Sequence, residues 1–227
     1  MSRDNSPPEG KPHHGCRWGL YVILDAGLAG RSHTELAQQA IKGGARVIQL
    51  RDKRATFEEL VEVGHELRRI TLEANVTFII NDNPYLAHEV KADGVHLGQM
   101  DCAVDIAREV MGPGKLVGLS THTKQQAIAA QMLGVDYIGL GPIYDTTTKK
   151  SEWATLGLGP LRWVRNISRV PIVAIGGITE ERLPDVAGAG ADNVAIIGDL
   201  MRAQDIASRA RHLSEIFHRS RKKGTES

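Results

Sequence analysis

Short apolar runs recur eight times along the chain, and this repetition constrains the fold more than any other feature of the sequence. Each run is apolar throughout and often β-branched, a pattern typical of strands in a parallel sheet with both faces buried. We therefore expect parallel strands connected by helices. The expected strands are Leu20–Leu24, Val47–Leu50, Thr77–Ile80, Gly94–Leu97, Leu116–Leu119, Tyr137–Leu140, Pro171–Ile175 and Asn193–Ile197.

The segments between these runs carry the spacing of amphipathic helices. Along Phe57–Glu73, apolar or small residues return every three or four positions, so one helix face can cover the sheet. Further helices are expected at Thr34–Lys42, Thr123–Leu133 and Glu180–Ala187, and over the segment that contains Ile206, Ala210, Leu213 and Phe217. Eight strand–helix units predict one α/β domain, a (β/α)8 TIM barrel, although the pattern alone also allows an open doubly wound sheet.

The barrel is expected to span residues 18–218, between two tails. Residues 1–17 are polar and rich in Pro and Gly, which predicts a flexible N-terminal tail without the apolar stretch of a signal peptide. Residues 219–227 are basic and are expected to form a poorly ordered C-terminal tail. Because no apolar run approaches the roughly 18 residues of a membrane span, a cytoplasmic location is the default expectation.

The overall composition excludes several classes of partner. The net charge is +1 and aromatic residues make up 4% of the chain. These values predict neither the global field nor the stacking surface that nucleic acids need, and no attraction to an anionic membrane. The two cysteines, Cys16 and Cys102, are interpreted as reduced thiols. Any anion binding must therefore come from local groups.

The end of the second expected strand carries Gln49, Arg51 and Lys53 on one side. In a barrel of this kind, residues at the carboxyl ends of the strands face the active site. An amide donor, a bidentate guanidinium and a point charge together suit a multiply charged phosphate ester. The alternative is a solvated loop with a fortuitous run of charge.

Two carboxylates follow the next two strands. Asn83 and Pro84 suit the N-cap and first position of a helix, which leaves Asp82 free for another role. Together with Asp101, it suits a hydrated Mg²⁺ ion. The alternative for Asp101 is a helix cap, and His96 is interpreted as a hydrogen-bonded core or rim residue and not as a ligand.

The remaining strand ends predict a second anion site. Ser120 follows the fifth strand, and the long loop after the sixth strand carries several threonines and Lys149, as a lid would. Gly177 and Gly198 lie in the loops after the last two strands, where backbone N–H groups of such barrels approach a phosphate. The alternatives are capping of the helix after the fifth strand by Thr121 or Thr123, and tight turns that require glycine. Two anion sites imply two charged substrates.

Read in order, these motifs resemble the thiamine-phosphate synthase (thiamine-phosphate pyrophosphorylase) family, from about Tyr21 to Gly198. The matching motifs are Gln49-Leu50-Arg51 with Lys53, Asn81-Asp82, His96-Leu97-Gly98-Gln99 with Asp101, Ser120 with His122, Gly141-Pro142 with Thr146, Thr148 and Lys149, and Gly176-Gly177-Ile178. The resemblance implies a transferase of thiamine biosynthesis. It would join 4-amino-2-methyl-5-pyrimidinylmethyl diphosphate to a thiazole ethyl phosphate, giving thiamine monophosphate and diphosphate by a dissociative displacement.

The resemblance also implies residue roles. Arg51, Lys53, Ser120 and Lys149 would be catalytic. The pyrimidine diphosphate would be held by Gln49, Arg51, Lys53, Asn81, Ser120 and Lys149, Mg²⁺ by Asp82 and Asp101, and the thiazole phosphate by Thr146, Thr148, Gly177, Ile197 and Gly198.

Two positions depart from the family pattern. The chain has Asp145 where the family usually has Pro, and Gly198 where it usually has Ser, so affinity for the thiazole phosphate is in question. Two other readings are a thiazole tautomerase of the same superfamily that uses His122, and a silent phosphate-ligand sensor. Neither needs the cations and carboxylates described above. The sequence leaves a homo-oligomer open, because apolar helix faces serve a core and a subunit interface alike.

Overall fold

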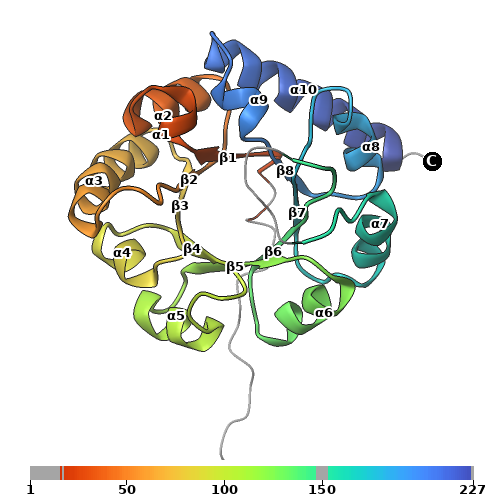
Figure 1. Ribbon diagram of the computed structural model, residues 1–227, viewed down its shortest axis with the longest axis horizontal. Helices are drawn as coiled ribbons and strands as arrows, with labels where there is room; N and C mark the ends of the chain where they lie inside the picture. The colour runs from red at the N-terminus through yellow and green to blue at the C-terminus, as the bar shows by residue number, and fades with distance from the viewer. Residues whose placement is uncertain (1–15, 17, 147–152, 226–227) are drawn as a thin grey trace, which may run out of the picture.

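Eight parallel strands pair in chain order and close into a barrel, which confirms the predicted TIM-barrel architecture (Figure 1). This computed structural model describes residue 16, residues 18–146 and residues 153–225. The strands are β1 Leu20–Leu24, β2 Val47–Leu50, β3 Thr77–Asn81, β4 Gly94–Leu97, β5 Leu116–Thr121, β6 Tyr137–Leu140, β7 Ile172–Ile175 and β8 Asn193–Ala195. Four match the sequence prediction in both bounds, and the closing contact pairs Leu20 of β1 with Val194 of β8.

Helices surround the barrel, as Figure 1 shows in the view down its axis. They are α1 Ala26–Ala29, α2 His33–Lys42, α3 Phe57–Glu73, α4 Pro84–Glu89, α5 Val104–Met111, α6 Lys124–Met132, α7 Leu158–Ile167, α8 Leu183–Gly188, α9 Gly198–Met201 and α10 Ile206–Thr225. Helix α3 starts where predicted because Thr56 and Glu59 form a reciprocal capping box. Among the described residues, no helix has the length and apolar character that crossing a membrane requires.

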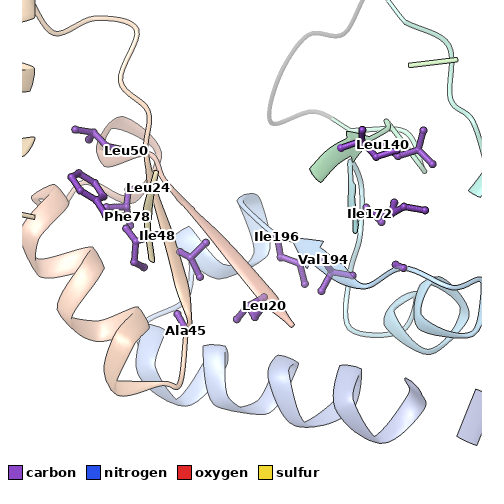
Figure 2. Close-up of a cluster of buried hydrophobic side chains, with 14 of the residues drawn as sticks. Leu20, Leu24, Ala45, Ile48, Leu50, Phe78, Leu140, Ile172, Val194 and Ile196 are labelled. Atoms are coloured by element: carbon purple, nitrogen blue, oxygen red, sulfur yellow. The ribbon is translucent and has the colours of Figure 1, made fainter. Parts of the chain in front are cut away.

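Alternation along the strands divides the buried residues into two clusters. One set, such as Leu20, Ile48 and Phe78, points outward and packs against the helices (Figure 2). The other set points inward and fills the barrel, and it includes Tyr21 and Tyr137. The uniform apolar character that predicted the strands thus arises from burial on both faces.

Glycines on the strands make room for large side chains inside the barrel. A Cβ atom on Gly118 would lie 2.2 Å from the ring of Tyr137, and one on Gly139 would lie 3.2 Å from the ring of His96. The inner wall of β5 and β6 therefore accepts an aromatic ring and an imidazole only because these positions carry no side chain.

Both predicted domain boundaries need correction. Helix α10 continues to Thr225, and Arg221 Nη1 donates to the carbonyl oxygen of Asp192 at 3.0 Å, so the poorly ordered tail predicted for residues 219–227 is wrong over most of its length. Arg219 and Lys222 are exposed on this helix, whereas Arg221 packs against Asp192. At the other end, Cys16 is buried and its carbonyl accepts from Asn193. The rest of the predicted N-terminal tail lies outside the described residues.

The crowding at Gly118 predicts a loss of stability on substitution. Gly118→Ala should lower the free energy of unfolding by about 1–3 kcal/mol, because the added methyl group must displace the buried Tyr137 ring. Urea denaturation followed by circular dichroism measures the change. Gly159→Ala is the matched control: that helical position has nothing within 4 Å of the added atom, so the free energy should stay the same or rise by up to about 1 kcal/mol. Equal losses for both variants would contradict this account.

Candidate active site

The ends of β2 and β3 bring the predicted cations against a carboxylate. Lys53 Nζ lies 3.1 Å from Asp82 Oδ2, and Arg51 Nη1 lies 4.0 Å from Asp25 Oδ2. A cavity of about 270 Å³ opens here, with Arg51, Lys53, Asn81 and Asp82 in its lining. The structure therefore brings Arg51 and Lys53 of the predicted anion site together with Asp82, whereas Gln49 lies inside the barrel.

Asp82 and Asp101 lie close enough for each side chain to shift the pKa of the other. Burial and the contact with Asp82 raise the pKa of Asp101. Burial opposes ionisation of Asp82 as well, but the hydrogen bond from Asp101 and the nearby Lys53 outweigh it and hold the pKa of Asp82 below its usual value. Ionisation of Asp101 beside the Asp82 carboxylate is therefore disfavoured.

Local backbone structure explains why both carboxylates are available. Asp82 adopts a left-handed conformation with φ of 66°, and Asn83 next to it caps α4 by accepting from the backbone N–H groups of Tyr85 and Leu86. Asp101 does not cap α5, because the cap position is Ala103, and Asp101 Oδ2 accepts instead from Gly98 N at 2.6 Å. The alternative reading of Asp101 as a helix cap is wrong.

Gln49 and Ser120 point into the barrel and lie at the two ends of a chain of hydrogen bonds. Gln49 is 1% exposed and its Nε2 donates to the hydroxyl of Tyr21 at 3.0 Å. At the other end, Ser120 Oγ lies 2.9 Å from His96 Nε2. His96 is hydrogen-bonded inside the barrel, as its interpretation as a core residue predicted.

A second cavity of about 540 Å³ lies at the ends of β5 to β8. Its lining includes Ser120, Thr146, Gly177, Ile197 and Gly198, all of them predicted. Glycine is required at position 177, since φ is 60° and a Cβ atom would lie 2.3 Å from the carbonyl oxygen of Asp145. The predicted contacts Thr148 and Lys149 lie outside the described residues.

Other side chains of this cavity were missed by sequence reasoning. Arg182 and Arg202 line it, and Arg182 Nη1 donates to the carbonyl oxygen of Gly177 at 2.6 Å. Arg182 follows β7 in the segment expected to be helical, where a single arginine carries no signal of its own. Its position five residues after Gly177, a glycine predicted to lie at a phosphate site, is the sequence feature that could have identified it.

Two contacts organise the loop that follows β6. Asp145 accepts a hydrogen bond from the hydroxyl of Thr155, so its carboxylate connects the two described parts of this loop. His122 stacks on Trp153 at 4.7 Å between ring centroids, and its Nδ1 lies 2.6 Å from the carbonyl oxygen of Gly141. Of the threonines proposed as caps, Thr123 caps α6, while Thr121 is buried and donates to the carbonyl oxygen of Gly139.

Comparisons with known proteins agree with this geometry. Residues 20–200 match the family model described as thiamine monophosphate synthase. The thiamine-phosphate synthase of Chloroflexus aurantiacus is 45% identical over 88% of this chain and 93% of its own length, and that of Moorella thermoacetica is 42% identical over 91% and 99%. Among solved structures, a thiamine phosphate pyrophosphorylase from Pyrococcus furiosus superposes with a TM-score of 0.84 and 33% identity, over 91% of this chain and 98% of that one.

The acidic pair predicts a pH-dependent cost in stability when divalent cations are removed. The pKa of Asp101 is higher in the folded than in the unfolded protein. The contribution of this group to the free energy of unfolding is therefore fully present below its unfolded pKa. It is lost as the pH rises through its folded pKa. Asp101→Asn, which stays neutral but can still donate to Asp82, should therefore stabilise the protein at pH 8 in chelator. The gain should shrink toward pH 4. Urea denaturation across this range tests it, and a variant less stable than the native chain at pH 8 would contradict it.

Proposed function

The chain belongs to the thiamine monophosphate synthase family, and from this membership we propose how its barrel mouth divides the work between two substrates. Its activity is thiamine-phosphate synthesis, a transferase reaction on small phosphorylated substrates. We infer that the ends of β2 to β5 hold the pyrimidine diphosphate and that the cavity at β5 to β8 holds the thiazole phosphate.

On the pyrimidine side, strand residues supply the contacts. Gln49 and Ser120 lie inside the barrel and present amide and hydroxyl groups at the depth where a heteroaromatic ring would enter. Asn81 ends β3 beside Arg51 and Lys53 at the rim. This order, with uncharged groups deep and cations shallow, fits a ring that carries a diphosphate on its methyl arm.

The acidic pair fits Mg²⁺. Asp82 raises the pKa of Asp101 because two neighbouring carboxylates repel each other, and a divalent cation held by both would offset that repulsion. Both donors are carboxylate oxygens, the ligand type that Mg²⁺ prefers. When bound, the ion would offset the negative charge of the diphosphate oxygens.

The remaining residues act on the leaving group and on water. Arg51 and Lys53 stabilise charge that builds on the diphosphate as its bond to the pyrimidinylmethyl carbon breaks, and a group of this kind typically contributes roughly 3 kcal/mol. The thiazole nitrogen then attacks the resulting cation. Trp153, stacked on His122, lines the cavity, where its ring would limit the approach of water. Lys149 is proposed to join the diphosphate contacts.

The thiazole phosphate is assigned to the glycine-lined cavity. Thr146 and the backbone around Gly177, Ile197 and Gly198 supply small, close-approaching surfaces of the type that holds phosphate in this fold. Thr148 is proposed to add a second hydroxyl. Arg182 brings positive charge to the same cavity, which helps to compensate for Asp145.

One observation carries the proposal: Lys53, Asp82 and Asp101 converge on one side of the barrel mouth while the glycine loops form a cavity on the other. A tautomerase or a phosphate sensor needs the second site alone. His122 is held by Gly141 and Trp153, an arrangement that supports the loop more than proton transfer. Diphosphate release that requires both substrates and Mg²⁺ is the decisive assay, and thiazole isomerisation without it would favour the tautomerase.

Removal of one magnesium ligand should impair the chemistry and spare the fold. Asp82→Asn is expected to lower kcat at least tenfold, because it weakens both the proposed metal site and the ion pair with Lys53. Folding should change little, since Asn tolerates the left-handed backbone of this position. Steady-state diphosphate release at saturating Mg²⁺ measures the effect.

Asp105→Asn is the matched control for that experiment. Asp105 is exposed in the first turn of α5, four residues after Asp101, and it lines neither cavity of the barrel mouth. Its kcat should stay within about twofold of the native value. If Asp82→Asn keeps full turnover with an unchanged Mg²⁺ requirement, the metal assignment is wrong.

The carboxylate of Asp145 should weaken binding of the thiazole phosphate. Asp145→Asn removes the charge and keeps an oxygen that can accept from Thr155, so the KM for this substrate should fall about two- to fivefold, the range expected for an exposed charge interaction of roughly 0.4–1 kcal/mol. The KM for the pyrimidine diphosphate serves as the internal control and should not change. A higher thiazole KM in the variant would show that the carboxylate organises the loop instead.

A further inference from the structure

A continuous chain of hydrogen bonds crosses the interior of the barrel from β2 to β5. Gln49 Nε2 lies 3.0 Å from the hydroxyl of Tyr21, which lies 3.0 Å from the hydroxyl of Tyr137. The Tyr137 hydroxyl lies 3.2 Å from His96 Nδ1, and His96 Nε2 lies 2.9 Å from Ser120 Oγ. The chain thus joins the two ring-contacting residues of the proposed pyrimidine site through three side chains without an assigned role.

The direction of this chain is fixed at its first member. An amide NH2 group can only donate, so Tyr21 accepts from Gln49 and must donate its own proton onward. Tyr137 accepts that proton and in turn donates to His96 Nδ1. If the chain ran in the opposite direction, the Tyr21 hydroxyl oxygen would accept from both Gln49 and Tyr137. The Tyr21 proton would then have no acceptor among the contacts described.

The surroundings keep every member in this state. Burial raises the pKa of both tyrosines well above the ordinary value, so each phenol retains its proton. Trp18 packs edge-on against Tyr21 and Tyr137, with ring centroids 5.6 and 5.3 Å away. Gly118 on β5 provides the space for the Tyr137 ring.

We propose that this chain sets the tautomer of His96 and thereby makes Ser120 a hydrogen-bond donor toward the pyrimidine substrate. With Nδ1 accepting from Tyr137, the ring proton lies on Nε2 and is donated to Ser120 Oγ. Ser120 lies at the end of β5, the strand that the two proposed sites share, and its hydroxyl proton is then available to the pyrimidine ring on the β2 side of the barrel mouth. A Ser120 hydroxyl that donates favours a substrate group that accepts a hydrogen bond, such as a ring nitrogen, over one that donates, such as an exocyclic amino group. Tyr21, Tyr137 and His96 are positioning residues, and the inference rests on the proposed pyrimidine site.

Nitrogen NMR of the free protein tests the tautomer without any substrate. In protein labelled with ¹⁵N-histidine, with the His96 signals identified by their loss in His96→Asn, the proton should lie on Nε2. Gln49→Glu, whose carboxylate can only accept, should reverse the chain and move the proton to Nδ1 at high pH. If that variant does not fold, Tyr137→Phe should produce a mixture of the two tautomers. A native protein with the proton on Nδ1 overturns the proposal.

Kinetics test the consequence at Ser120. Tyr137→Phe should lower kcat/KM for the pyrimidine diphosphate about tenfold and leave the KM for the thiazole phosphate unchanged. In a Ser120→Ala background, the same substitution should cost less than twofold, because the group that it orients is gone. An equal cost in both backgrounds indicates a merely structural role and overturns the proposal. Tyr85→Phe, an exposed phenol on α4, is the control and should match the native enzyme.

The two tests separate this inference from the assigned reaction. Failure of the native protein to form product from both substrates would count against the proposed function, while the tautomer of His96 would still be readable by NMR. Conversely, full synthase activity with the proton on Nδ1 would remove the positioning role and leave the proposed function intact.

Discussion

Closure of the barrel is the constraint on which the rest of this structure depends. Eight strands that pair in a ring force every second residue into a narrow interior, where volume and hydrogen bonding must both be satisfied. The chain meets the volume requirement by placing Gly118 against the ring of Tyr137. It meets the polar requirement by linking Gln49 to Ser120 through buried hydroxyl and imidazole groups. The same side chains therefore fill the barrel interior and orient the residues of the proposed site.

The same closure gathers the carboxyl ends of all the strands at one mouth. The residues there include pairs that lower the stability of the fold but suit the proposed function. Asp82 and Asp101 lie close enough for Asp82 to raise the pKa of Asp101, although a neutral residue at either position would avoid their repulsion. Lys53 relieves part of this cost. Because the net charge of the chain is only +1, such local pairs, and not a global field, must attract and hold the anionic substrates.

Sequence reasoning succeeded where a pattern is local and failed where it depends on contacts across the barrel. Burial on both faces predicted the strands, and the Asn83-Pro84 cap identified Asp82 as available. Tyr21 and Tyr137 gave no functional signal, because an aromatic residue in an apolar strand predicts only a core position, and their partnership spans 116 residues. The length of α10 was missed for a related reason: its basic end resembles a solvated tail until Arg221 is seen against Asp192.

The two halves of the site also differ in how rigidly they are built. Gln49, His96 and Ser120 belong to strands, and one chain of hydrogen bonds across the barrel interior orients their side chains. Asp145 and Gly198 instead lie beyond the ends of β6 and β8, in connections that tolerate substitution more readily. Both departures from the family pattern fall in this second half. A change at Gln49 would alter packing, tautomer and substrate contact together, whereas a change at position 145 alters charge at one edge of a cavity. The residues proposed to contact the pyrimidine ring are therefore the ones that the barrel itself holds in place.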